Sequence, residues 1–199
     1  MEAAPTHMTE QAYLDATRDG AGPWALRHEW VNGRAYAMAG GSPRHAAVTT
    51  NALGVLLGLC RGRPCRPTNG DQRLHVEATG SYFYPDAMVI CGRFEPSSAD
   101  PDSVVNPVLL VEVLSPSTRD YDRGAKFEHY RRIPSVQHVL FIDPDVHHVV
   151  HVARREDGWL WRDLTEGVVS MPEVGELPIA ELYADLGALP PATGEEPEG

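Results

Sequence analysis

Long hydrophobic runs are missing from this sequence of 199 residues. A membrane-spanning helix needs about 20 consecutive apolar residues, and no run here approaches that length. The chain also does not open with a charged segment followed by an apolar one, as a secretory leader does. Hydrophobic residues make up 42% and charged residues 23%, which is ordinary for a globular domain. We therefore expect a cytoplasmic protein with no membrane partner.

Cysteine is also scarce, because the chain contains only Cys60, Cys65 and Cys91. An odd number of cysteines without metal-ligand spacing argues against a disulfide framework and against a zinc site. The sequence therefore predicts three free thiols, as in proteins of a reducing compartment.

Positive charge is in short supply, and the formal net charge of −11 argues against a general nucleic-acid binder. Seven acids and no lysine or arginine fall within residues 171–199, so the rest of the chain carries only −4. The arginines also form two clusters, which are either basic patches or ordinary solvated side chains. These clusters are Arg61, Arg63, Arg66 and Arg73, and then Arg119, Arg123, Arg131 and Arg132.

Lysine is nearly absent, because Lys126 stands alone against sixteen arginines. A lysine that survives such a bias suggests a site that needs a compact ammonium rather than a planar guanidinium. It falls on a helix predicted to begin after Thr118 as the N-cap, beside the buried face that Phe127 and Tyr130 mark. The alternative is a surface lysine paired with Asp122, four residues earlier.

The remaining patterns predict one domain over residues 1–189 and an acidic tail over residues 190–199. The tail is rich in proline, glycine and glutamate, so we expect it to be disordered. Asn32-Gly33 between strand-like segments 26–31 and 34–38 predicts a β-hairpin. Ser42-Pro43 predicts the start of a helix over residues 44–59.

Two apolar runs with one carboxylate each lie at the centre of the sequence. Residues 84–90 contain Asp86 and residues 108–114 contain Glu112, and both runs are typical of buried strands. A buried carboxylate is costly unless it is paired or binds a metal. If the strands are neighbours, Asp86 and Glu112 can hold one Mg²⁺ ion, which prefers oxygen ligands. The alternative is that Glu112 pairs with an arginine in the core.

Other candidate residues each have two interpretations. Glu29 lies on the first strand of the hairpin, either as an exposed residue or as a third acid near the metal. His45 lies near a predicted helix N-terminus, where it either packs or contacts a phosphate. His147 and His151 could hold zinc on a helix, but the valines around them favour a strand, on which they would lie too far apart.

Several motifs together resemble one known family, the Uma-type restriction endonucleases of the PD-(D/E)XK nuclease superfamily. The motifs are Tyr84-Pro85-Asp86, Glu112-Val113-Leu114-Ser115-Pro116-Ser117-Thr118, Asp122-Arg123-Gly124-Ala125-Lys126, Tyr130 and Ile142-Asp143-Pro144. Glu29, Asn32-Gly33 and Ser42-Pro43-Arg44-His45 fit the same family, so the resemblance covers roughly residues 8–185.

The resemblance implies an α/β, restriction-endonuclease-like core, with a mixed central β-sheet flanked by helices and additional antiparallel hairpins. It implies a metal-dependent endonuclease that hydrolyses DNA with Mg²⁺ or Mn²⁺. Asp86, Glu112 and the carbonyl of Val113 would bind the metal, and Lys126 would act in catalysis. Glu29 and His45 are secondary candidates.

The sequence departs from the superfamily pattern at one place, because Leu114 stands where the motif lysine is expected. The resemblance implies that this lysine has moved to the following helix, as Lys126. The alternative is a catalytically inactive nuclease fold, kept as a module for dimerisation or partner binding. A homodimer is compatible with both alternatives.

Overall fold

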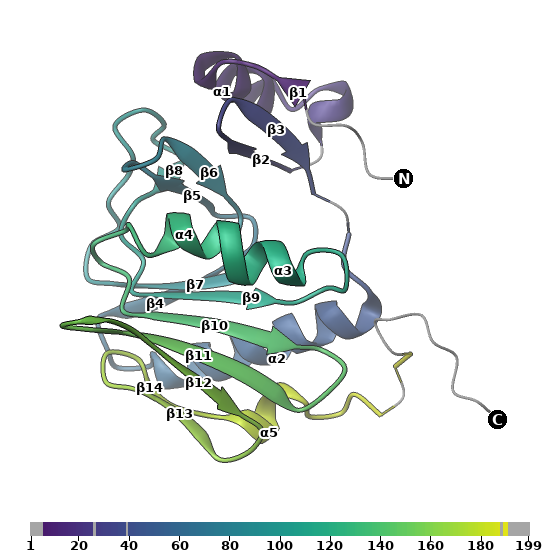
Figure 1. The fold of residues 1–199 in the computed structure, drawn as a ribbon, viewed down its shortest axis with the longest axis vertical. Helices are drawn as coiled ribbons and strands as arrows, with labels where there is room; N and C mark the ends of the chain where they lie inside the picture. The colour runs from purple at the N-terminus through teal and green to yellow at the C-terminus, as the bar shows by residue number, and fades with distance from the viewer. Residues whose placement is uncertain (1–5, 26, 39, 188, 191–199) are drawn as a thin grey trace.

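A computed structural model describes residues 6–25, 27–38, 40–187 and 189–190. The predicted tail, apart from Pro190, lies outside these residues. Two six-stranded sheets form within the described part of the chain (Figure 1). No helix there is long and apolar enough to cross a membrane.

The central sheet is mixed, as predicted, since β9 and β10 are parallel while its other neighbours are antiparallel. Its strands, in spatial order, are β12 (Gly158–Leu164), β11 (His148–Arg155), β10 (His138–Asp143), β9 (Leu109–Val113), β7 (Ala87–Cys91) and β4 (Cys65–Asn69).

The second sheet contains the short strands near the N-terminus. In spatial order they are β1 (Thr6–His7), β3 (Arg34–Ala37), β2 (His28–Val31), β6 (Ser81–Phe83), β5 (Arg73–Val76) and β8 (Ser103–Val104). β2 and β3 form the predicted hairpin, in which Asn32 and Gly33 both have positive φ angles, 52° and 77°. Positive φ at both central residues matches the twist of a two-residue hairpin, and it explains the Asn-Gly pair.

Helices cover both faces of the central sheet (Figure 1). On one side lies α2 (Pro43–Leu59), with Ser42 as the predicted N-cap and Pro43 at its first turn. On the other side lie α3 (Arg119–Tyr121), the π-helical turn η2 (Asp122–Lys126) and α4 (Phe127–Tyr130). The smaller elements are α1 (Glu10–Asp19), the 3-10 turn η1 (Gly22–Ala25), α5 (Ile179–Leu182) and the hairpin of β13 (Val168–Met171) and β14 (Gly175–Pro178).

Strand alternation divides the core into two layers, because successive side chains point to opposite faces of a sheet. Ala87 and Val111 pack with α2 on one face. Met88 and Leu110 pack with Phe127 and its neighbours on the other face. Glu112 has the parity of Leu110, so its carboxylate points to the face that α3, η2 and α4 cover.

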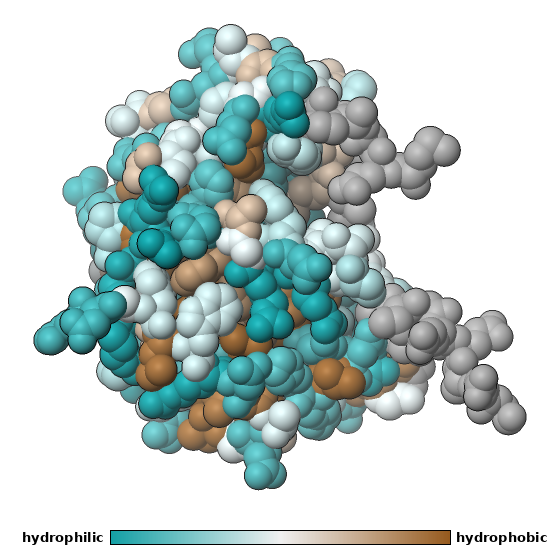
Figure 2. Space-filling view, in the orientation of Figure 1, coloured by the Kyte–Doolittle hydropathy of each residue, from teal (hydrophilic) through white to brown (hydrophobic). Residues whose placement is uncertain are grey.

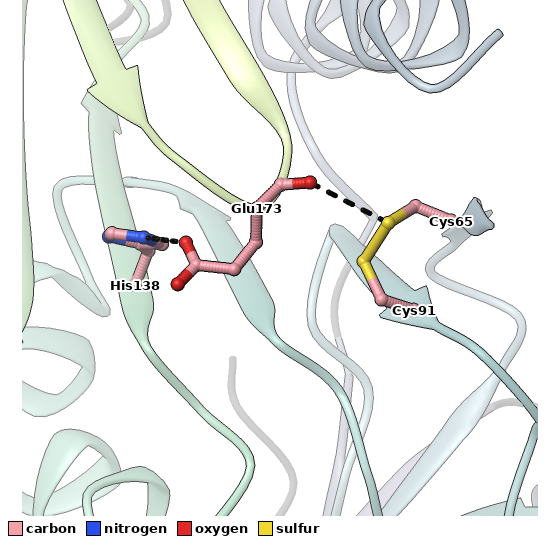
Figure 3. Close-up of a disulfide and its surroundings, with 4 residues drawn as sticks. All are labelled: Cys65, Cys91, His138 and Glu173. Carbon is pink, nitrogen blue, oxygen red and sulfur yellow. Dashed lines mark hydrogen bonds and ion pairs between the residues drawn. A yellow bond between two sulfur atoms is a disulfide. The ribbon is translucent and has the colours of Figure 1, made fainter. Parts of the chain in front are cut away.

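The prediction of three free thiols is wrong for two of the cysteines. Cys65 of β4 and Cys91 of β7 face each other across the antiparallel ladder and form a disulfide (Figure 3). The pairing joins strands 26 positions apart, so spacing along the sequence did not reveal it. Cys60 is free and buried. The cysteines therefore do not support a reducing compartment, and the cytoplasmic location stays a prediction.

Reduction of this disulfide is expected to lower the free energy of unfolding by about 3 kcal/mol, because a loop of this length gains entropy in the unfolded chain. Urea unfolding with and without a reductant measures the difference. A Cys65→Ser and Cys91→Ser double variant serves as the control, because it should not respond to the reductant. Equal stability of the wild type in both conditions would contradict the expectation.

Two buried histidines connect the central sheet to the turn between β13 and β14. His138 Nδ1 lies 3.0 Å from His151 Nε2. On its other side, His138 Nε2 lies 2.8 Å from Glu173 Oε2, a contact that Figure 3 shows. Since His138 donates through Nε2 to the carboxylate, its Nδ1 accepts the proton of His151 when both rings are neutral. The Glu173 carbonyl oxygen is 3.7 Å from Cys65 Sγ, but a disulfide sulfur carries no hydrogen, so this contact is not a hydrogen bond.

Burial, aided by the charge of His138 and Arg162, lowers the pKa of His151 to about 4 from its ordinary 6.5. A depressed histidine pKa stabilises the fold above pH 6.5, and this contribution is lost as the pH falls towards 4. Between pH 7 and pH 4, the wild type should lose on the order of 3 kcal/mol more stability than His151→Gln. Urea titrations at several pH values measure this, with His7→Gln, at an exposed position, as the control. Parallel pH profiles for the wild type and His151→Gln would contradict it.

Candidate active site

Two carboxylates meet at one end of the central sheet. β7 and β9 are antiparallel neighbours, with Ala87 opposite Val111. Continuing this register places Asp86, one residue before β7, opposite Glu112. Asp86 Oδ2 accepts a hydrogen bond of 2.7 Å from the Val113 amide, which fixes the carboxylate against the neighbouring strand. The two strands are thus adjacent, as predicted, although Asp86 precedes β7 and is only half-buried.

The ammonium of Lys126 lies among three buried carboxylates, one of which is Glu112 of this pair. Lys126 Nζ is 2.9 Å from Glu112 Oε1, 3.0 Å from Glu29 Oε1 and 3.5 Å from Asp122 Oδ1. These four residues are at most 7% exposed. The hydroxyl of Tyr130 donates to Glu112 Oε1 at 2.5 Å, so this one oxygen accepts from two donors.

A local irregularity of the helix turns Lys126 inward. The sequence predicted a regular helix capped by Thr118, but Thr118 makes no side-chain cap bond, and the segment is divided by the π turn η2. A π turn contains one more residue than an α turn and therefore changes which of its residues face the sheet. Lys126 consequently lies inside the buried face, 4% exposed, rather than beside it.

The electrostatics of this cluster follow from its burial. Burial disfavours the charged form of Lys126, but the carboxylates of Glu112 and Glu29 outweigh it, so the lysine pKa is well above its ordinary value. Burial raises the pKa of Glu112 well above its ordinary range, and the Asp122, Asp86 and Glu29 carboxylates add to this while Lys126 opposes it. Three carboxylates around one ammonium leave a surplus of negative charge.

His45 approaches the same end of the sheet from α2. Its backbone amide donates to the Ser42 hydroxyl at 3.1 Å, and its Nε2 lies 3.4 Å from Asp86 Oδ2. Burial lowers the pKa of His45, whereas the Asp86 carboxylate and the Val113 carbonyl raise it. The upward effects together are larger, so the pKa of His45 lies above its ordinary value. Gly41 leaves room for the ring, because a Cβ there would lie 2.6 Å from His45 Nδ1.

The structure brings all the predicted site residues into one connected network. Lys126 joins Glu112 to Glu29, and Asp86 joins His45 to the backbone of Val113. Two alternatives are therefore wrong, because Glu29 is buried, and the partner of Glu112 is a lysine rather than an arginine.

Leu114, at the position of the motif lysine, is 2% exposed and packs in the core with Phe127 and Leu110. Sequence reasoning did not assign Asp122 and Tyr130 to the site. Their spacing of four residues before and after Lys126 was the available signal, since residues four apart share one helix face. The helical zinc alternative for His147 and His151 is wrong, because β11 begins at His148 and His151 is bonded to His138.

The chemistry of the donors at this end of the sheet suits a hard cation. Among the described residues, no three His, Cys, Asp or Glu side chains are already arranged to hold a metal ion. Mg²⁺, however, commonly takes one or two carboxylates and fills its other positions with water. Asp86 and Glu112 are two such carboxylates and the Val113 carbonyl is a further candidate ligand, and the surplus of negative charge favours a divalent cation.

Comparison with known proteins connects this geometry to a family. Residues 20–179 match the sequence model "Uma2: Putative restriction endonuclease". A Synechocystis protein named "Uncharacterized protein sll1609" is 39% identical over 140 residues, which are 69% of this chain and 78% of the relative. Another, "Uncharacterized protein slr1290", is 33% identical over 135 residues, covering 67% and 70% respectively.

The fold also has a solved counterpart, described as a "putative nuclease belonging to DUF820 from Anabaena variabilis ATCC 29413". Its TM-score is 0.69, with 88% of this chain and 97% of that chain covered. Sequence identity is 18%, so this likeness concerns the fold alone. The predicted fold class is confirmed.

Proposed function

The chain belongs to the Uma2 family, whose description is "Putative restriction endonuclease", and from this premise we propose that it is a metal-dependent endonuclease acting on DNA. The observation that carries the proposal is the position of Lys126. Although Leu114 occupies the motif position, a lysine from another element reaches within 2.9 Å of the Glu112 carboxylate. This restores the pairing of acid and lysine that the chemistry of the superfamily requires.

Asp86, Glu112 and the Val113 carbonyl would hold Mg²⁺ or Mn²⁺. When bound, the ion would supply Lewis acidity towards a phosphate oxygen and towards water. Because the pKa of Lys126 is raised, its ammonium stays protonated and would stabilise the negative charge that develops on the phosphate. Tyr130 fixes one oxygen of Glu112, and Glu29 holds the ammonium from the other side. His45 positions the carboxylate of Asp86.

A homodimer is part of the same proposal, because two active sites related by a twofold axis would face the two antiparallel strands of a duplex. Light scattering with and without duplex DNA tests it. If the protein is a monomer in both conditions, the homodimer is contradicted, but the proposed nicking of a single DNA strand is not.

Plasmid cleavage tests the proposed function. Supercoiled DNA incubated with the protein and Mg²⁺ or Mn²⁺ should become nicked or linear, and EDTA should prevent this. Absence of cleavage with either metal, together with absence of any thermal shift on adding the metals, would overturn the proposal. The chain would then be a non-catalytic module with a nuclease fold.

A further inference from the structure

A recess lies between the helical segment that carries Lys126 and the β11–β12 hairpin. It has a volume of about 710 Å³ and is formed by residues of η2 and α4 and by the β11–β12 hairpin. We call it the Trp–Arg recess, after Trp159, Trp161, Arg123, Arg131 and Arg154 in its lining. The proposed function does not use any of these residues.

The two tryptophans provide a rigid aromatic surface. They are two residues apart on β12 and therefore point to the same face of the sheet. The Trp161 ring packs against Phe127, with centroids 5.0 Å apart, and stacks with Phe141 at an interplanar angle of 10°. Even so, 39% of Trp161 is exposed. A ring that is held on one side and open on the other can stack with a planar ligand.

The charges of the recess differ from those of the molecule. The chain carries −11, yet three arginines and only two acids, Glu128 and Asp157, line the recess. The guanidinium of Arg154 lies 4.4 Å from the Trp159 ring and donates to the carbonyls of Val136 and Ile133. It therefore fixes Trp159 against the segment that follows α4.

The other two lining arginines come from the helical segment, Arg123 from η2 and Arg131 from the C-terminal end of α4. Arg131 is exposed and pairs with Glu128 at 3.2 Å. Arg123 forms no ion pair with any residue that the structure describes. On this side of the molecule, Figure 2 shows hydrophilic groups interleaved with white and brown ones rather than a continuous apolar patch. Such a mixture of aromatic rings and arginines favours an anionic ligand with planar groups.

The recess and the candidate active site share one face of the central sheet. Glu112 lies opposite Phe141, Phe141 opposite Val150, and Val150 opposite Asp163, so three strand spacings separate Glu112 from Asp163. Trp161 lies two residues further along β12. The usual strand dimensions then place the Cα atoms of Glu112 and Trp161 roughly 15 Å apart, a separation that a few nucleotides can span.

We propose that the Trp–Arg recess binds unpaired bases of a single-stranded nucleic acid segment. A base stacks on Trp161, and Arg123 and Arg131 contact the phosphates beside it. This proposal rests on the proposed function in that the strand so held is the substrate whose backbone reaches Asp86 and Glu112. Aromatic platforms flanked by arginines are how proteins bind single strands without reading their sequence.

Fluorescence anisotropy with a labelled dT single strand, in EDTA so that no cleavage occurs, tests the proposal. Trp161→Ala should weaken binding by about tenfold or more, because one stacked base is lost. Arg123→Gln should weaken it less and reduce the slope of log affinity against log salt by about 0.7, the value for one phosphate contact on a single strand. Because Arg123 is not part of the hydrophobic core, Arg123→Gln remains informative if Trp161→Ala folds poorly.

The chain offers matched controls on the opposite face of β12. Leu160 is 37% exposed, close to the value for Trp161, and Arg162 is an exposed arginine next to it. Leu160→Ala and Arg162→Gln should leave single-strand affinity unchanged. A fully paired duplex should bind less tightly than the single strand and should respond less to Trp161→Ala.

The outcomes separate this proposal from the proposed function. If the protein cleaves plasmid DNA but Trp161→Ala and Arg123→Gln leave its single-strand affinity unchanged, the proposal for the recess is overturned and the proposed endonuclease function stands. If both variants lose single-strand affinity but the wild type does not cleave DNA, single-strand binding at the recess is supported and the proposed endonuclease function is not. Displacement of a bound fluorescent probe by polyglutamate but not by a dT strand would overturn the proposal in favour of an acidic peptide.

Discussion

Cleavage is expected to fall by about 100-fold or more in Lys126→Arg, although the positive charge is kept. The ammonium lies among Glu29, Glu112 and Asp122 in a closed space. A guanidinium is wider and spreads its charge over a plane, so it cannot place one compact charge beside Glu112. Loss of one positioned electrostatic stabiliser typically costs a factor of this size in rate. Initial rates of plasmid nicking, at a temperature where circular dichroism shows both proteins folded, measure the effect.

Lys126→Ala should lose both activity and stability. Removing the ammonium leaves buried carboxylates without their partner, which typically costs about 3–5 kcal/mol. The sequence alone placed Lys126 beside the buried face, whereas the structure places it inside that face. Arg18→Lys in an exposed ion pair of α1 is the control and should match the wild type. Undiminished cleavage by both Lys126 variants would remove this residue from the chemistry.

Metal binding is expected to weaken by about 100-fold or more in Asp86→Asn, while the fold without metal keeps its stability. The amide removes the negative charge that attracts a divalent cation. Its oxygen can still accept the hydrogen bond that the Val113 amide now donates to Asp86 Oδ2. Burial is the main reason why the pKa of Glu112 is raised, and removal of the Asp86 carboxylate relieves the repulsion that adds to it. Calorimetric titration with Mg²⁺ and Mn²⁺ measures the change.

Thermal unfolding provides an independent readout of the same substitution. A ligand present at 100 times its Kd stabilises the native state by about 2.7 kcal/mol, so the wild type should melt at a higher temperature with metal. Asp86→Asn should show no such shift at the same concentration, while Asp102→Asn, in an exposed loop, should retain it. Unchanged metal affinity in Asp86→Asn would exclude this carboxylate from the site.

Local patterns were sufficient for the elements that build the site. Asn32-Gly33 predicted the β2–β3 hairpin, because few other residue pairs adopt positive φ twice in succession. Ser42 and Pro43 predicted the start of α2, because both suit a helix N-terminus without any distant contact. The apolar runs around Asp86 and Glu112 predicted two buried strands, because strand burial leaves a continuous hydrophobic signature.

Contacts between distant residues were not available from those patterns. The Cys65–Cys91 disulfide depends on the pairing of β4 with β7, and strand pairing is set by register rather than by composition. The second sheet depends on strands as short as β6, whose pairing with β2 joins Tyr82 to Trp30. Segments of two or three residues carry too little periodicity to be recognised from the sequence.

The sequence by itself determined which groups could do the chemistry: two carboxylates in buried strands, one lysine among sixteen arginines, and a family resemblance that joins them. Only the tertiary structure decided where that lysine points. The π turn η2 and the approach of β2 bring Lys126 between Glu112 and Glu29. An ammonium so deeply buried keeps its charge only because carboxylates from separate elements surround it, and that arrangement exists once the sheet and its helices have packed.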